Sequence, residues 1–91
     1  MKHVILKCAE LNDLAQLHKE LKELLNFPSY YGENFDALYD CLTEIGEPIR
    51  FEVRDLRTSK LGPAGRVLRQ VLLDAAESNP NFDVVFTRTE Q

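Results

Sequence analysis

Tryptophan is absent from the 91 residues, and cysteine occurs only twice, at Cys8 and Cys41. Two cysteines do not make a disulfide framework, so we expect both thiols to be reduced in a cytoplasmic protein. No apolar run is long enough to span a bilayer. The first seven residues also lack the long apolar stretch and small-residue cleavage site of a signal peptide. A membrane protein or a disulfide-rich secreted domain is therefore not expected.

Recognisable catalytic and metal-binding motifs are missing as well. The serines at positions 29, 59 and 78 have no nucleophile-elbow frame, and residues 62–65 (GPAG) lack the Lys and Ser/Thr of a phosphate-binding loop. The spacing of the two histidines and two cysteines matches no zinc site. We therefore predict a protein that is not an enzyme and that needs no metal or cofactor.

Positive charge is absent from one long segment. Residues 23–49 contain six acids and no Lys or Arg, so this segment carries −6 while the rest of the chain carries +2, for a net charge of −4. This balance disfavours nucleic acid or an anionic membrane as a partner. One interpretation is a solvated acidic face. The six acids are Glu23, Glu33, Asp36, Asp40, Glu44 and Glu47.

The remaining composition is that of a globular protein, with 44% hydrophobic and 29% charged residues, and the length predicts a single domain over residues 1–91. Short β-branched or alternating runs predict strands at 3–7, 49–54 and 83–87. Helical spacing predicts helices over 14–25, from Asn34 to about Gly46, and from about 67 to 78, with a loop at 55–65. The order β-α-α-β-(short turn)-α-β predicts an α/β fold with a three-stranded parallel sheet packed against helices.

Each predicted helix has an apolar stripe that we expect to face the core. In the first helix the stripe is Leu14, Leu17, Leu21, Leu24 and Leu25, and in the second it is Phe35, Leu38, Leu42 and Ile45. In the third it is Val67, Leu68, Val71, Leu72 and Ala75.

The opposite face of the second helix carries an acidic stripe. Its members are Asp36, Asp40, Thr43, Glu44 and Glu47. Acids four residues apart on a helix repel one another, at about 0.2–0.5 kcal/mol per pair, and no Lys is interleaved to relieve them. The stripe therefore opposes folding. This favours the interpretation that the row of carboxylates meets cations on a partner.

Tyrosines flank this stripe. Tyr30 and Tyr31 lie in the loop before the helix, and Tyr39 lies on it. Tyrosine is enriched at binding hot spots. The alternative is that one or two of these rings pack in the core. Core packing and partner binding are equally favoured for Tyr31, and core packing is less favoured for Tyr30.

Residues 30–43 read YYGENFDALYDCLT. This segment resembles the signature of the barstar family, a Tyr-Tyr-Gly-Glu-Asn loop that runs into an Asp-Ala-Leu-aromatic-Asp-Cys-Leu helix. The resemblance implies a compact α/β inhibitor that plugs the active site of a basic, barnase-like extracellular ribonuclease in a 1:1 complex. Outside residues 27–45 the resemblance is mainly one of pattern and order of elements.

The resemblance also implies roles for single residues. Asp40 would occupy the phosphate position and meet the catalytic Arg and His of the enzyme. Tyr30 would pack on that His, Asp36 would reach an Arg in the base-recognition region, and Thr43 would add a hydrogen bond. Asp74 aligns best with an acid that contributes from the last helix. The complete predicted contact surface is Tyr30, Tyr31, Gly32, Asn34, Asp36, Tyr39, Asp40, Thr43, Glu44 and Asp74.

The sequence departs from the best-known member of that family at several positions. Tyr39 stands where that protein has a tryptophan, and Glu44-Ile45 replaces a Gly-Trp pair. A second acid on the last helix corresponds to Ser78. These departures keep an alternative open, namely an immunity or adaptor protein of the same fold that binds a different nuclease toxin or another basic protein. We expect the free protein to be a monomer.

Overall fold

The computed structural model describes residues 1–89 and shows an α/β fold in which three helices pack on a three-stranded parallel sheet. This confirms the predicted fold class and order of elements. Along the chain the elements are β1 (Lys2–Lys7), the 3-10 turn η1 (Cys8–Glu10), α1 (Leu14–Leu24), α2 (Phe35–Thr43), β2 (Ile49–Arg54), α3 (Pro63–Ser78) and β3 (Phe82–Thr87). Within residues 1–89 no helix has the length and apolarity needed to cross a membrane.

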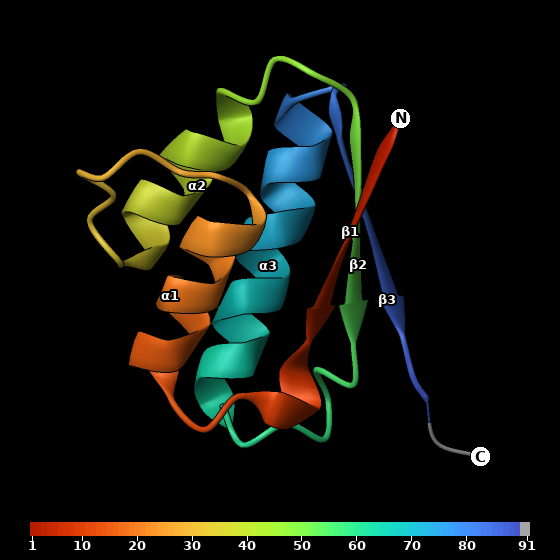
Figure 1. The fold of residues 1–91 in the computed structure, drawn as a ribbon. Coiled ribbons are helices and arrows are strands. Elements are labelled where there is room, and N and C mark those ends of the chain that lie inside the picture. Colours follow the sequence, from red (N-terminus) through yellow and green to blue (C-terminus); the bar gives the residue numbers. More distant parts are fainter. Residues whose placement is uncertain (90–91) are drawn as a thin grey trace.

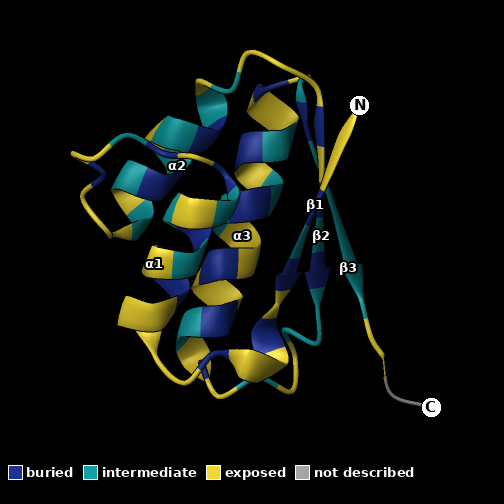
Figure 2. Cartoon of the chain, in the orientation of Figure 1, coloured by how far each residue is buried: buried dark blue, intermediate teal, exposed yellow. Residues whose placement is uncertain are grey.

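The sheet has the order β1-β2-β3, and both pairings are parallel. Its register places Val4 beside Phe51 and Phe51 beside Val84. All helices lie on one face of the sheet, with α3 next to the strands and the other face uncovered (Figure 1). Alternating burial along β1 and β2 follows from this arrangement, because every second side chain points toward the helices (Figure 2).

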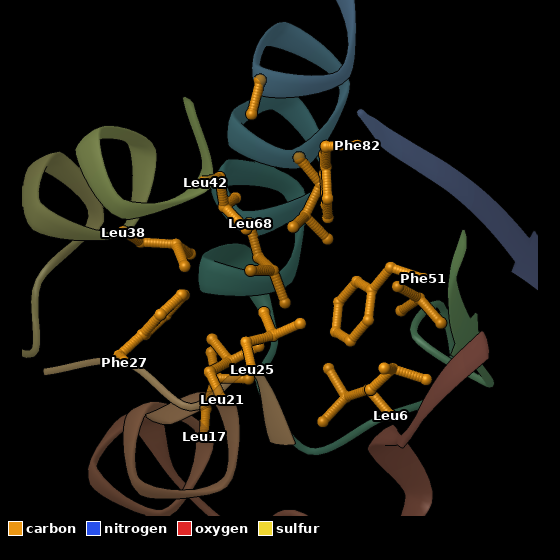
Figure 3. Packing of buried hydrophobic residues seen from close by; sticks show 14 of the residues in the cluster. Leu6, Leu17, Leu21, Leu25, Phe27, Leu38, Leu42, Phe51, Leu68 and Phe82 are labelled. Carbon is orange, nitrogen blue, oxygen red and sulfur yellow. The ribbon is translucent and has the colours of Figure 1, made fainter. Parts of the chain in front are cut away.

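The core lies between the helices and the covered face of the sheet (Figure 3). Two leucines of each helix are fully buried there, and the rings of Phe51 and Phe82 lie 6.0 Å apart. The fully buried leucines of the helices are Leu17, Leu21, Leu38, Leu42, Leu68 and Leu72. Their spacing of three or four residues within each helix is the spacing that predicted the stripes.

Two members of the predicted stripes were assigned wrongly. Leu14 is 40% exposed because it is the first residue of α1, and Val67 is 47% exposed. The buried stripe of α3 is Gly65, Leu68, Leu72 and Ala75, which places Val67 about 100° away from Leu68 around the helix.

The predicted loop at 55–65 is too long at its end, because α3 already begins at Pro63. Proline suits the first helical position, where its missing N–H has no helical partner in any case. Gly62 precedes it with φ 59° and ψ −135°, a conformation that is open almost only to glycine. The Gly-Pro pair therefore starts a helix where the sequence pattern indicated a turn.

Candidate functional site on α2 and its preceding loop

Asn34 begins α2. Its Oδ1 accepts a hydrogen bond from the backbone N–H of Ala37 at 2.7 Å, and its Nδ2 donates to the carbonyl of Gly32 at 3.3 Å. The first bond is an N-cap, and the second ties the loop to the helix. The sequence prediction of a cap at Asn34 is confirmed, and the residue acts by fixing how the loop meets α2.

Gly32 lies where this loop comes closest to the helix. A Cβ at this position would lie 3.2 Å from Nδ2 of Asn34 and 3.4 Å from the Cβ of Ala37. A side chain at position 32 would require Asn34 or the loop to shift by a few tenths of an ångström. The next residue, Glu33, adopts φ 53°, a conformation that costs energy for a residue with a Cβ. The loop before α2 is thus tightly constrained.

The two tyrosines of the loop point in opposite directions. Tyr30 is 84% exposed, whereas Tyr31 is buried. The ring of Tyr31 lies 4.9 Å from that of Phe27, and its hydroxyl is 2.6 Å from Nδ1 of His18 on α1. Tyr30 is therefore free to contact a partner, and Tyr31 anchors the loop to the core.

His18 is a positioning residue that sequence reasoning assigned no role. It is buried, and its ring also lies 5.5 Å from the ring of Phe35, the first residue of α2. Burial lowers the pKa of His18, partly opposed by the charge of Glu33, and burial raises the pKa of Tyr31. A signal was present in the sequence, because position 18 lies between Leu17 and Leu21 on the buried face of α1.

The acids of the stripe are exposed and form no ion pair within residues 1–89. Asp36 and Asp40 are both exposed on α2. The ion pairs found in residues 1–89 join side chains of the strands, and none includes an acid of α2. Thr43 is half-buried, and its hydroxyl donates to the carbonyl of Asp40 at 2.9 Å. The geometry leaves two carboxylates, one turn apart, open to a partner.

The helix is shorter than the stripe that was predicted on it. α2 ends at Thr43, and Glu44 is its C-cap, with its backbone N–H bonded to the carbonyls of Cys41 and Leu42. Glu44 is exposed beside the end of the helix, and Glu47 lies beyond it in the connection to β2. The part of the stripe on helical backbone is therefore Asp36, Asp40 and Thr43.

Asn79 completes the end of α2, a contribution that the sequence analysis did not predict. Its Nδ2 donates to the carbonyls of Leu42 at 2.9 Å and Ile45 at 3.0 Å, and the residue is only 5% exposed. Neighbouring Asn81 adds a longer bond of 3.4 Å to the carbonyl of Ile45. These amides satisfy carbonyls at a helix end where no Lys or Arg is available.

α3 lies beside α2 and brings the last predicted contacts toward the site (Figure 1). The hydroxyl of Tyr39 lies 2.9 Å from Oγ of Ser78, so two of the positions that depart from the family pattern touch each other. Asp74 is exposed on α3 and accepts a hydrogen bond from Nε2 of Gln70 at 2.9 Å.

Thiol and metal chemistry find little support at this site. Burial raises the pKa of Cys8 to about 12, and burial followed by the charges of Glu44 and Asp40 raises the pKa of Cys41. Both thiols are thus poor nucleophiles. Among residues 1–89 no group of three or more His, Cys, Asp or Glu side chains is arranged to hold a metal ion.

Comparison with known proteins shows what the chain is similar to. The family model described as "Barstar (barnase inhibitor)" matches residues 1–89. A protein of Bacillus subtilis (strain 168) named "Putative ribonuclease inhibitor YrdF" is 34% identical over 80 residues, which are 85% of this chain and 88% of that protein. The similarity therefore extends well beyond the segment 27–45 in which the resemblance was most specific.

Proposed function

The chain belongs to the barstar family, and from this premise we propose that it inhibits a basic ribonuclease by inserting the exposed face of α2 and Tyr30 into the active site of the enzyme. The observation that carries the proposal is the pair of exposed, unpaired carboxylates on α2, beside an exposed tyrosine on a constrained loop. The inhibitor acts in the cytoplasm as a monomer and forms a 1:1 complex.

The carboxylates imitate the substrate. A ribonuclease binds RNA phosphate with cationic side chains, and a carboxylate held in the same place accepts charge-assisted hydrogen bonds from them. We assign Asp40 to the position that the RNA phosphate occupies in the ribonuclease. Asp36 then binds a neighbouring Arg of the enzyme. Thr43 adds a polar contact at the end of α2, and Asp74 adds one from α3.

Rigidity supports this role. The cap at Asn34, the close approach at Gly32 and the buried Tyr31–His18 pair hold the loop, while Asn79 holds the far end of α2. A surface that is already ordered loses little conformational entropy on binding. The constrained surroundings of α2 are thus what an inhibitor that works by shape and charge requires.

The contact between Tyr39 and Ser78 bears on which ribonuclease is bound. Their hydroxyls meet at the junction of α2 and α3, so the two departures from the family pattern form one joint patch. Glu44, the C-cap of α2, is exposed as well. We infer that this patch adapts the protein to a nuclease, or a nuclease toxin, that differs from the best-known target of the family.

The test is titration of a barnase-type ribonuclease, cleaving a fluorogenic RNA, with the protein at low and high salt. We expect inhibition that saturates at one equivalent and weakens with salt, because surface charges are screened. The Asp40→Ala variant should inhibit poorly, and Glu10→Ala, an exposed acid on η1, should inhibit like the wild type. Equal inhibition by the two variants would refute the mechanism.

If the barnase-type enzyme is not inhibited at all, affinity capture from the native cell decides between a different nuclease and another basic protein. Recovery of a ribonuclease whose activity the protein blocks would support inhibition with altered partner choice. Recovery of basic proteins without nuclease activity would contradict it.

A further inference from the structure

A second charged surface lies away from α2, and its charge is positive. A hollow of about 760 Å³ lies between the start of α3 and the end of β3. Its wall includes four arginines and two apolar side chains, namely Arg57, Arg66, Arg69, Arg88, Leu56 and Phe86. We refer to it as the basic hollow. No acid is among the described residues that line it, although the chain as a whole carries a net charge of −4.

Three of these arginines have no carboxylate partner. The ion pairs within residues 1–89 involve His3, Arg50 and Arg54, and none involves Arg57, Arg66 or Arg69. Arg69 instead lies over the ring of Phe86, with its Cζ 5.1 Å from the ring centroid. Hydrogen bonds from Thr89 lower the pKa of the Asp55 carboxyl most, and the positive charge of Arg88 lowers it further. Because Arg88 already interacts with an acid of the chain, its charge is not counted among those available to a ligand. Three positive charges therefore face one hollow without forming an ion pair among residues 1–89.

The basic hollow lies at the carboxyl ends of the strands, away from the end of α2. β2 and β3 end at the same edge of the sheet, and α3 begins there, whereas α2 ends toward the opposite edge (Figure 1). Arg66 and Arg69 are three residues apart on α3 and so share one face of its first turns.

The lining indicates the chemistry of the ligand. Guanidinium groups bind phosphate oxygens in pairs of parallel hydrogen bonds, and several of them around one hollow favour a ligand with more than one negative charge. Leu56 and Phe86 supply an apolar wall that inorganic phosphate could not use. The volume lies within the range of small-molecule pockets.

We propose that the basic hollow binds a small organic polyphosphate of the nucleoside diphosphate class, with its phosphates on the arginines and its ring against Leu56 and Phe86. This site goes beyond the proposed inhibitory function. It shares no residue with the α2 surface, so both can be occupied together.

The test is an NMR titration of the full-length ¹⁵N-labelled protein with ADP, and separately with adenosine and with inorganic phosphate. We expect ADP to shift amide signals of residues 56–57, 64–69 and 86–88, and to bind roughly tenfold or more tightly than either fragment. No shift at millimolar ADP, or shifts scattered over the surface, would overturn the proposal. Equal binding of ADP and one fragment would overturn the combined phosphate-and-ring site.

A matched pair of variants separates a site from general charge attraction. Arg66→Glu and Lys2→Glu change the net charge equally, both positions are exposed, and Lys2 lies at the opposite end of the sheet. Arg66→Glu should weaken ADP binding roughly tenfold or more, while Lys2→Glu should leave it nearly unchanged. Equal weakening by both would refute a localised site. Arg66→Glu should still inhibit ribonuclease, which keeps this proposal distinguishable from the inhibitory one.

Discussion

The uncovered face of the sheet and the exposed face of α2 both present carboxylates to solvent, but they treat them differently. On the sheet, Glu52 accepts hydrogen bonds from Arg54 and Thr87 and lies 3.2 Å from His3, and Asp83 pairs with Arg50. On α2, Asp36 and Asp40 have no cation near them in the described chain. The acids of the sheet thus contribute to folding through their partners, whereas Asp36 and Asp40, one turn apart on one helix face, are left open to another molecule.

The largest expected effect concerns binding by α2. Replacing Asp40 by Ala would leave cations of the ribonuclease buried without a partner, which we expect to cost about 3 kcal/mol or more, a rise in Kd of roughly 100-fold or more. The matched change on the sheet, Asp83→Ala, should leave Kd nearly unchanged. Inhibition kinetics at several inhibitor concentrations measure both values, and similar Kd values for the two variants would break the comparison.

The next effect concerns the support of α2. Asn79→Ala removes two hydrogen bonds to carbonyls of Leu42 and Ile45 at a buried position, and we expect a loss of about 2 kcal/mol or more in the free energy of unfolding. Asn81→Ala removes only a longer bond to Ile45 from a half-buried position, so its loss should be clearly smaller. Urea unfolding followed by circular dichroism compares them, and equal losses would contradict the role assigned to Asn79.

Most of the fold was predictable from the sequence because its signals are local. Leucines at helical spacing and alternating apolar residues gave the helices, the strands and their order, and Asn34 gave the start of α2. The burial of His18 could have been predicted from its place beside Leu17 and Leu21, but the hydrogen-bond partners of His18 and Asn79 could not, because Tyr31, Leu42 and Ile45 are distant in the sequence. The early end of α2 could not be predicted for the same reason, because the contacts that fix it come from the turn after α3, which is distant in the sequence.

A pH effect should distinguish the buried His18–Tyr31 pair from the charges of the surface. Because burial lowers the pKa of His18 in the folded protein, the unfolded chain binds its proton more readily. The free energy of unfolding therefore depends on pH through His18. The folded protein keeps its full stability above about pH 6.5, the ordinary pKa of histidine, and loses stability as the pH falls below that value. Glu33 opposes the shift but does not reverse it.

The measurement is the free energy of unfolding between pH 5 and 7.5, a range that lies above the titration of ordinary carboxylates. We expect the wild type to lose stability toward pH 5. A variant with both His18→Phe and Tyr31→Phe keeps two aromatic rings in place and leaves neither polar group buried alone, so its stability should vary less with pH. The same slope in both proteins would show that His18 is not the group that titrates.

The smallest expected effect tests the paired and unpaired acids through folding alone. Asp40→Asn relieves repulsion toward Asp36 and Glu44, and Asn and Asp have similar helix propensities, so the free energy of unfolding should rise by about 0.5 kcal/mol. Glu52→Gln should lower the free energy of unfolding. The hydrogen bond from Arg54, followed by that from Thr87, lowers the pKa of Glu52, so the ionised carboxyl stabilises the folded state at pH values above the ordinary pKa of a carboxyl. Thermal unfolding at neutral pH and low salt gives both signs. A loss of stability in Asp40→Asn would mean that Asp40 serves folding after all. A gain would mean that the acidic face of α2 is kept at a cost to stability, as expected if it serves binding to a partner.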